Sequence, residues 1–262
     1  MKNVIKTTSI LALLLLGGLN GGDTKGYQVK KIVIDAGHGG KDPGTQGRFS
    51  QEKTITLQVA LKLGKLIQSN MKGVKVVYTR QKDEFVALYQ RANLANKNNA
   101  DVFISIHCNA ALNSNRACGT EIFTMGLHTA SNNLAVTKRE NGVILMEDSY
   151  EAHYQGFNPH LPESHILFSL YQNAYNESSL RLAQHIEDRL KRGTGRKSRG
   201  VKQAGFLVLW KTTSPSVLVE IGFITHPEEE KYLTKRSGQA QIAAGIFEGL
   251  KKYKQDIESY SS

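Results

Sequence analysis

Ile32-Val33-Ile34-Asp35-Ala36-Gly37-His38-Gly39-Gly40-Lys41-Asp42-Pro43-Gly44 is the stretch that decides the fold of this chain. Its three β-branched residues in a row predict a strand buried on both faces, as in a parallel sheet. The strand ends in a glycine-dense segment, where the backbone can turn sharply and approach a ligand closely. Neither a P-loop Lys-Ser/Thr pair nor a GxGxxG register follows, so phosphate binding is excluded. His38 is therefore a candidate ligand or acid/base group, with a structural histidine as the alternative.

Length and composition indicate one ordinary globular unit. The chain has 262 residues, of which 40% are hydrophobic and 22% charged. This suits a single α/β domain with insertions, or at most two small domains. The formal net charge of +11 predicts an anionic partner: nucleic acid, acidic lipid or an anionic wall polymer. Because no RNA-binding signature or helix-turn-helix pattern is present, we expect no nucleic-acid partner.

The first 22 residues differ in kind from the rest. Lys2 and Lys6 precede an apolar run, Ile10–Leu16, which is too short to span a bilayer comfortably. This pattern is typical of a secretory signal. We expect a signal peptide or N-terminal anchor over 1–22, a linker over 23–29, and export to the periplasm or cell envelope with no further membrane span. A buried N-terminal helix is the alternative.

A carboxylate lies at the start of the first predicted helix. Ser50 is a plausible N-cap, and apolar residues then recur at helical spacing to about Ser69. Glu52 shares the inward stripe of this helix, so it needs a partner if it is buried. A favourable interaction with the helix dipole explains Glu52 equally well.

A second apolar strand, Asp101–Ala110, also ends with a histidine. Period-two alternation places His107 on one face of this strand and Cys108 on the other. In an exported protein Cys108 and Cys118 could form a disulfide, and two free thiols are the alternative. The same periodicities predict strands at 74–79, 119–124 and 214–223 and helices at 85–95 and 242–250.

Two imidazoles and one carboxylate make a coherent metal site. His38, Glu52 and His107 match a three-ligand zinc set with an open fourth position. Zinc lowers the pKa of a bound water toward ~7 and polarises a carbonyl, which makes amide hydrolysis feasible at neutral pH. The spacing of these residues is not a short local motif, so three unrelated structural residues remain the alternative.

A further carboxylate, Glu220, lies inside the apolar run Ser214–Phe223. An unpaired carboxylate there costs several kcal/mol if it is ionised. One interpretation is an ion pair with Arg or Lys. The other is a general base toward the zinc-bound water, acting later as the acid for the leaving amine.

Four motifs together resemble the zinc N-acetylmuramoyl-L-alanine amidases of the Amidase_3 type. They are Ile34–Gly40, Glu52 before a long helix, Ser105–Ala110 and Val219–Ile224. The resemblance covers about Lys30 to Tyr253. It departs from the family at Cys108, where many relatives carry alanine.

The resemblance implies an α/β fold: a single domain with a twisted, mostly parallel sheet of about six strands between helices. It implies a catalytic domain over 30–256, followed by a tail at 257–262. It also implies Zn²⁺ held by His38, Glu52 and His107, catalysis by Glu220, and peptidoglycan as substrate. The bond cleaved would join the lactyl group of N-acetylmuramic acid to L-alanine of the stem peptide. Asn109 is a candidate substrate contact. Two alternatives remain: a zinc peptidase cutting within stem peptides, and a non-catalytic wall-binding module.

A long insertion, approximately 127–190, precedes Glu220. Helical patterns are expected at 134–146 and 166–190, with an exposed loop between them at 147–164. Family members that act in cell separation carry a similar insertion, which covers the active site until a partner protein displaces it. We therefore expect an autoinhibitory cover that offers Glu140, Glu147 or Asp148 to the zinc. A merely structural surface excursion is the alternative.

The segment 191–202 carries six basic residues among glycines. Such a run is typical of a solvated loop. The alternative is a surface that guides anionic wall material or stem-peptide carboxylates toward the site.

Overall fold

A single six-stranded sheet forms the centre of the protein. The computed structural model describes residues 28–111, 116–127, 131–170 and 174–259. The strands lie in the order β2-β1-β3-β6-β4-β5. Neighbouring strands are parallel except for the antiparallel pair β4 and β6, so the predicted α/β fold is confirmed. The strands are β1 (Lys31–Ala36), β2 (Lys75–Tyr78), β3 (Val102–Asn109), β4 (Thr120–Met125), β5 (Ser198–Ala204) and β6 (Ser216–Phe223).

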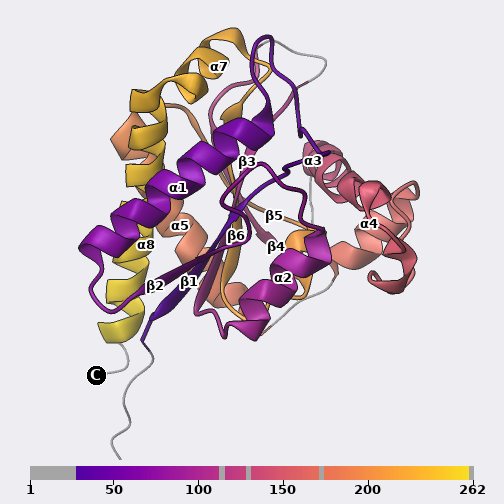
Figure 1. Ribbon diagram of the computed structural model, residues 1–262, viewed down its shortest axis with the longest axis horizontal. Helices are drawn as coiled ribbons and strands as arrows, with labels where there is room; N and C mark the ends of the chain where they lie inside the picture. The colour runs from indigo at the N-terminus through magenta and orange to yellow at the C-terminus, as the bar shows by residue number, and fades with distance from the viewer. Residues whose placement is uncertain (1–27, 112–115, 128–130, 171–173, 260–262) are drawn as a thin grey trace, which may run out of the picture.

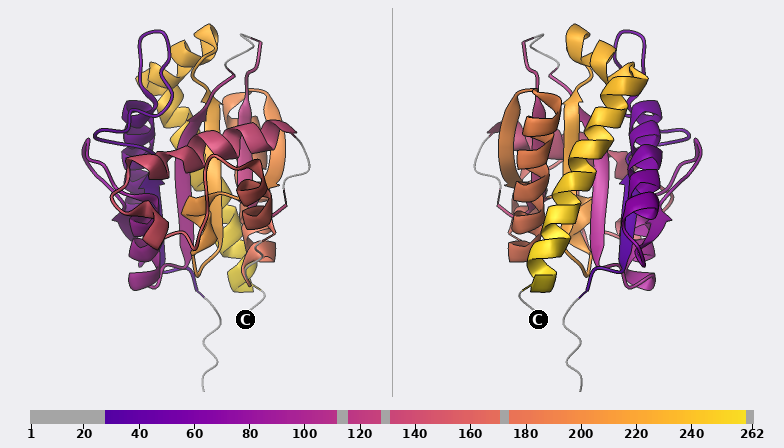
Figure 2. Two further views of the ribbon diagram at one scale, coloured as in Figure 1. Left: turned by 90° about the vertical axis from the view of Figure 1, so that its right-hand side faces the viewer. Right: turned by 90° about the vertical axis from the view of Figure 1, so that its left-hand side faces the viewer.

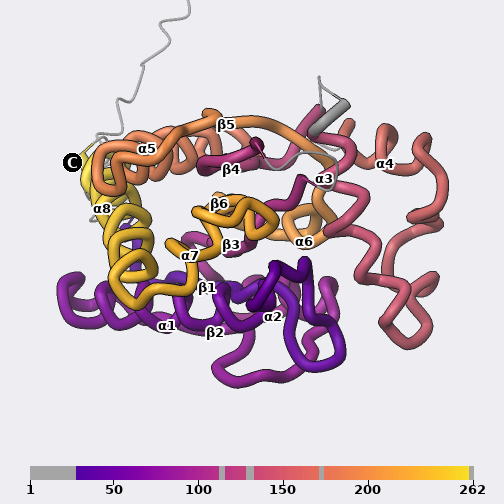
Figure 3. The backbone as a smooth tube through the Cα atoms, turned by 90° about the horizontal axis from the view of Figure 1, so that it is seen from above, coloured from indigo at the N-terminus to yellow at the C-terminus, as the bar shows by residue number. Residues whose placement is uncertain are grey.

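Helices cover both faces of this sheet (Figures 1 and 3). One layer is made of α1 (Glu52–Asn70), α5 (Asn176–Thr194) and α8 (Arg236–Ser259). The opposite layer holds α2 (Leu88–Lys97), α6 (Leu207–Trp210) and the insertion, while α7 (Pro227–Thr234) follows β6. Strand alternation divides the core between the layers, since Ile32 and Ile34 pack in the first and Val33 in the second.

The insertion consists of short helical pieces, seen at the right of Figure 1. They are α3 (Ser131–Asn141), the 3₁₀ turns η1 (Gly142–Met146) and η2 (Tyr150–Ala152), and α4 (Pro162–Ser169). The prediction of an exposed loop at 147–164 is wrong for two aromatic residues. Tyr154 and Phe157 are only 1% and 4% exposed. Phe157 packs edge-on against Phe168 at 4.8 Å, and both belong to the apolar core on this side of the sheet.

The basic run is not a solvated loop. Helix α5 continues to Thr194 and ends at Gly195 with a positive φ of 62°, after which the chain forms the edge strand β5. Arg199 and Lys202 of β5 both pair with the buried carboxylate of Glu121 on β4. Charged side chains are usual on an edge strand, and here two of them pair with the buried Glu121 carboxylate.

The structure also bears on three smaller expectations from the sequence: the N-cap of α1, the state of the two cysteines and the ends of the chain. Gln51, and not Ser50, is the N-cap residue of α1, and the Ser50 hydroxyl instead donates a hydrogen bond to Glu230. Both cysteines are free thiols. Residues 1–27, including the predicted signal, lie outside the described residues, and α8 extends to Ser259, past the predicted start of the tail. Among the helices that the structure describes, none has the length and apolarity needed to cross a membrane.

Candidate metal centre

Three of the predicted ligands meet at one edge of the sheet. His107 lies near the carboxyl end of β3, and His38 follows the carboxyl end of β1. Glu52 is the first residue of α1, which begins at the same edge. All three side chains are buried. Parallel strands present their carboxyl ends together, and this brings residues distant in sequence to one place.

Glu140 of α3 completes a four-residue cluster. Its Oε2 lies 3.2 Å from His38 Nε2 and 2.9 Å from His107 Nδ1. Glu52 Oε1 lies 3.0 Å and 3.1 Å from the same two nitrogens, and the nitrogens are 3.1 Å apart. Tetrahedral zinc with ligands at 2.0–2.1 Å requires separations of about 3.3 Å between them.

The donor set also fits a metal ion. Two imidazoles and two carboxylates are ordinary zinc ligands. Although two imidazole nitrogens lie close to it, the buried Glu140 Oε2 makes no well-aligned hydrogen bond within the described ranges. Such an arrangement suits four donors that face one shared cation better than a set of pairwise hydrogen bonds.

The backbone around His38 is shaped for this close approach. His38 itself has a φ of +61°, a left-handed conformation that is uncommon for a non-glycine residue and costs energy. A Cβ on Gly37 would lie 2.4 Å from His107 Cε1, and one on Gly44 would lie 2.6 Å from His38 Cδ2. Side chains at these two positions would push the imidazoles apart.

Two buried arginines hold this strained turn. Arg91 Nη2 donates to the carbonyl of His38 at 2.9 Å, and Arg91 Nη1 pairs with Asp35 at 2.7 Å. Arg80 Nη2 donates to the carbonyl of Gly37 at 2.8 Å. These contacts offset the energy cost of the left-handed conformation at His38 and hold the turn against β1 and α2.

Outer contacts orient the ligands. His38 Nδ1 lies 2.7 Å from Asp42 Oδ2, which fixes the ring and leaves Nε2 facing the cluster. Glu52 accepts hydrogen bonds from the backbone N–H groups of Thr45 and Cys108, both at 2.8 Å. Carboxylate–imidazole pairs and backbone donors of this kind are usual around metal ligands.

The cluster is strongly charged in the absence of a cation. Burial disfavours the charged form of His107, yet the carboxylates of Glu140 and Glu52 outweigh it and raise the pKa of this imidazole to about 9. The same balance, with Glu52 as the main partner, raises the pKa of His38 well above its usual value. Burial raises the pKa of Glu52, but the imidazoles prevail and lower it to about 2. Each imidazole thus lies against two carboxylates, an arrangement in which a divalent cation can take the place of bound protons.

Of the three carboxylates expected from the insertion, Glu140 lies in the cluster. Glu147 lies elsewhere, where it accepts hydrogen bonds from the Leu88 N–H and the Tyr154 hydroxyl, each at 2.7 Å. Asp148 is exposed. Of the three alternatives, Glu140 is therefore the carboxylate that lies in the cluster, while Glu147 holds η1 against the start of α2.

Glu220 lies beside the cluster on β6, paired in register with His107 of β3. It is fully buried, and neither of its carboxylate oxygens has a hydrogen-bond partner among the residues described. Arg139 Nη2 lies 3.5 Å from its Oε1. Burial and the Glu140 carboxylate raise the pKa of Glu220 well above its usual value, although Arg139 opposes this.

Asn109 lies two residues beyond His107, after a register shift in β3. Its amide donates to Glu121 at 2.9 Å, and its carbonyl oxygen accepts from Arg139 at 3.3 Å. The predicted substrate contact is therefore occupied by neighbouring side chains in this structure. A bulge at a sheet edge of this kind commonly re-aims side chains next to a site.

The sequence reasoning missed several of these contributors. Asp42 could have been found, since an acid four residues after His38 is placed to orient its ring. Arg139 directly precedes Glu140, and its ion pair with that carboxylate at 2.8 Å gave no signal in the sequence. Arg91 lies on an amphipathic helix, where an arginine is normally assigned to solvent.

Comparison with known proteins agrees with this geometry. Residues 32–252 match the Amidase_3 family model, described as N-acetylmuramoyl-L-alanine amidase. The N-acetylmuramoyl-L-alanine amidase AmiA of Escherichia coli is 36% identical over 225 residues, which cover 85% of this chain and 75% of the relative.

Solved structures give the same result. An N-acetylmuramoyl-L-alanine amidase from Clostridium difficile superposes with a TM-score of 0.64 at 30% identity, covering 87% of this chain and 97% of the other. The CwlD amidase of Clostridioides difficile, solved in complex with the GerS lipoprotein, gives a TM-score of 0.63 at 27% identity and covers 86% and 98%. By its matching family model, its relatives and its fold, this chain belongs to the Amidase_3 family of N-acetylmuramoyl-L-alanine amidases.

Proposed function

We propose that this protein hydrolyses the amide between N-acetylmuramic acid and L-alanine of the stem peptide by a zinc-dependent mechanism. His38, Glu52 and His107 would hold the ion. The observation that carries the proposal is the set of ligand separations near 3 Å among buried imidazole and carboxylate atoms. Membership of the amidase family supplies the substrate bond.

Zinc, when bound, would polarise the scissile carbonyl and activate a water molecule. Glu220 lies next to His107 in the sheet, where it would take the proton from the attacking water and return it to the leaving amine. Its buried position favours the protonated form, which suits the second of these transfers. Asp42 would keep the His38 ring oriented while the reaction proceeds.

The test is digestion of purified sacculi, with and without a chelator, followed by product analysis. We expect free stem peptides and glycan strands without peptides, with activity lost on chelation and restored by zinc. Glu220→Gln should retain zinc and lose about 10²–10⁴-fold in rate, the usual contribution of acid–base catalysis. Cleavage inside the stem peptide would indicate a zinc peptidase. Binding to sacculi without any product would indicate a wall-binding module.

We also propose that the insertion inhibits the enzyme. Glu140 fills the position that substrate and water need, and Arg139 pairs with Glu220 at 3.5 Å. Both residues lie on α3, so one element blocks the metal and the acid–base group together. Deleting 131–170 and joining the ends with a short flexible linker should raise sacculus hydrolysis. Unchanged or lower activity in a folded deletion protein would reject the inhibition.

An activator protein is the proposed means of release. Four apolar side chains are exposed on and beside α4, the element that packs against α3. They are Leu161, Ile166, Leu167 and Leu170. Exposed apolar side chains that gather in this way are typical of a protein-binding surface. Within this proposal the enzyme is exported through residues 1–22, lies in the periplasm or cell envelope, and acts in cell separation or wall remodelling.

The partner is tested by substitution. Leu167→Glu should abolish activation by a binding partner while leaving the basal rate unchanged, because this side chain is 63% exposed. Glu163→Ala on the exposed side of the same helix is the control. Equal activation of both variants would place the partner elsewhere.

A further inference from the structure

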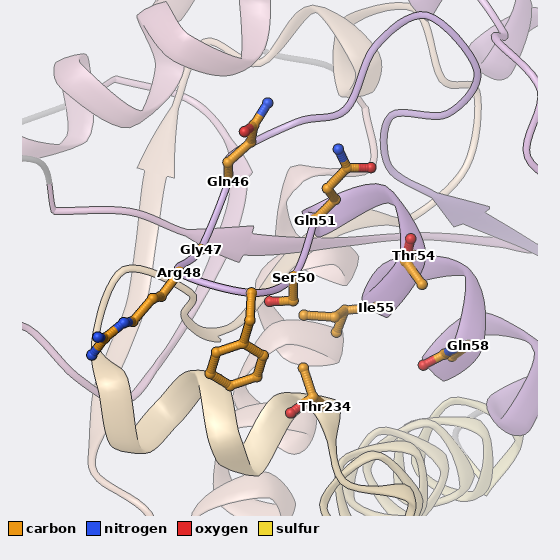
Figure 4. A pocket seen from close by; sticks show the side chains of 10 residues that line it. Gln46, Gly47, Arg48, Ser50, Gln51, Thr54, Ile55, Gln58 and Thr234 are labelled. Atoms are coloured by element: carbon orange, nitrogen blue, oxygen red, sulfur yellow. The ribbon is translucent and has the colours of Figure 1, made fainter.

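A groove opens beside the metal centre, on the outer side of the segment that follows His38. It has a volume of about 640 Å³, within the range of small-molecule sites. Figure 4 shows its side chains, which come from the loop, from the first two turns of α1 and from the end of α7. We call it the loop groove. It is lined by Gln46, Gly47, Arg48, Phe49, Ser50, Gln51, Thr54, Ile55, Gln58 and Thr234.

One short segment belongs to both the groove and the metal centre. On its inner side, the N–H of Thr45 donates to Glu52, and Gly44 lies against the His38 ring. On its outer side, residues 46–51 form a wall of the groove. Gln51 directly precedes the ligand Glu52. A molecule in the groove would therefore contact the same segment that contacts the metal cluster, and none of the ten lining residues belongs to the insertion.

The groove wall is built before any ligand arrives. The buried carboxylate of Glu230 accepts hydrogen bonds from the N–H of Phe49 at 2.8 Å and from the Ser50 hydroxyl at 2.7 Å. A Cβ on Gly47 would lie 2.2 Å from the same carboxylate. The Gly47 N–H also closes the turn onto the Ser50 carbonyl at 2.9 Å. A preformed wall reduces the entropy cost of binding.

The chemistry of the lining is polar and lacks negative charge. The lining holds three glutamine amides and three hydroxyls. The hydroxyls of Ser50 and Thr234 already donate to Glu230, so toward a ligand they act as acceptors. The amides of Gln46 and Gln51 can both donate and accept. Phe49 is 60% exposed, so its side chain offers an apolar aromatic surface to a molecule in the groove. Arg48 is the one charged residue among the ten, and no carboxylate is present.

These features match a sugar chain. A pyranose ring offers hydroxyl and acetamido groups around its edge, which pair with amides and hydroxyls, and an apolar C–H face, which packs on an aromatic ring. A free peptide rich in carboxylates would instead call for several cations, and the groove supplies one.

We propose that the loop groove binds the sugar rings of the glycan strand that flank the muramic acid unit being cleaved. This inference rests on the proposed amidase function. Because the insertion contributes nothing to the groove, strand binding is separate from inhibition. The enzyme can therefore bind a glycan strand while the insertion still inhibits it, before an activator is present.

The binding test uses the full chain carrying Glu220→Gln and measures dissociation constants by titration. The probes are purified glycan strands with stem peptides, the same strands stripped of peptides, and free stem peptide. We expect the Glu220→Gln protein, the parent of the variants below, to bind both kinds of strand and not the free peptide. Phe49→Ala and Gln51→Ala should each weaken strand binding about three- to tenfold. Both side chains are exposed, so the fold should tolerate the changes.

Gln68→Ala, an exposed glutamine further along α1 and outside the groove, is the matched control and should bind strands like the parent. Equal binding by the groove variants and the control would overturn the proposal, as would weakened binding that appears only when peptides are present.

A kinetic arm separates this inference from the amidase function. In a Glu140→Ala background, which removes the carboxylate proposed to inhibit the enzyme, Phe49→Ala should raise KM for long strands several-fold with little change in kcat, while a single disaccharide–peptide is cleaved as before. If the Glu140→Ala protein releases no stem peptide from any substrate, the amidase function fails, and strand binding is still decided by the titration. If Phe49→Ala lowers kcat equally on all substrates, the groove is part of the reaction site and the proposal is wrong.

Discussion

The edge of the sheet and the insertion contribute to the same four-residue cluster in different ways. His38, Glu52 and His107 are themselves buried, and the turn that carries His38 is held by Arg80 and Arg91. Glu140 comes from a chain of short helices, where Leu167 is 63% exposed. Three ligands therefore cannot leave without unfolding the sheet. Under the proposed inhibition the fourth would leave with its helix, so three residues would hold the metal and Glu140 would act as a removable block.

The largest effect should come from removing a permanent ligand. His38→Ala takes away one of the two imidazoles, so zinc binding should be lost together with at least about 10³-fold of activity. Metal content and stem-peptide release measure the two losses. Near-normal zinc content with full activity would show that the sheet edge is not the metal site.

Stability should distinguish the two regions in the same way. Ile106 is fully buried in β3, so Ile106→Ala should lower the free energy of unfolding by about 2–5 kcal/mol. Leu167→Ala on α4 should change it by no more than about 0.5 kcal/mol. Denaturant unfolding measures both. Similar losses would mean that the insertion is as firmly integrated as the sheet.

Removing the insertion's ligand should have the opposite effect on activity. Glu140→Ala is expected to raise sacculus hydrolysis about 5- to 150-fold, the usual range of coupling between a regulatory element and a site. Asp148→Ala is the matched control, because this carboxylate of the insertion is exposed and lies outside the cluster. A fall in activity with Glu140→Ala would make this residue a working ligand and end the distinction between the two regions.

The smallest effect concerns pH. The pKa of His107 is raised to about 9 in the metal-free cluster, so its charge contributes stability that is fully present below the unfolded value of 6.5. This contribution, about 1–3 kcal/mol, should be lost as the pH rises from 6.5 through 9. The zinc-loaded protein should lack this decline, since the ion replaces the protons. Melting temperatures with chelator and with zinc measure the difference, and a metal-free melting temperature that rises over this range would contradict it.

Some features of the fold and of the metal centre could be predicted from the sequence, and others could not. His38 and His107 could be singled out because each follows an apolar run that only a buried strand explains. Strand β5 could not, because Ser198–Ala204 contains little apolar alternation and owes its conformation to pairing with β4. The burial of Arg91 was equally hidden, since it depends on Asp35, 56 residues away. Long-range partners of this kind are set by topology, which local patterns do not encode.

Arg139 and Glu140 are consecutive residues, and each engages a different part of the reaction machinery. A single outward step of α3 would withdraw both at once, so partial displacement gives little leakage of activity. Release from the proposed inhibition would then depend on the displacement of one helix, with no second contact to be broken separately.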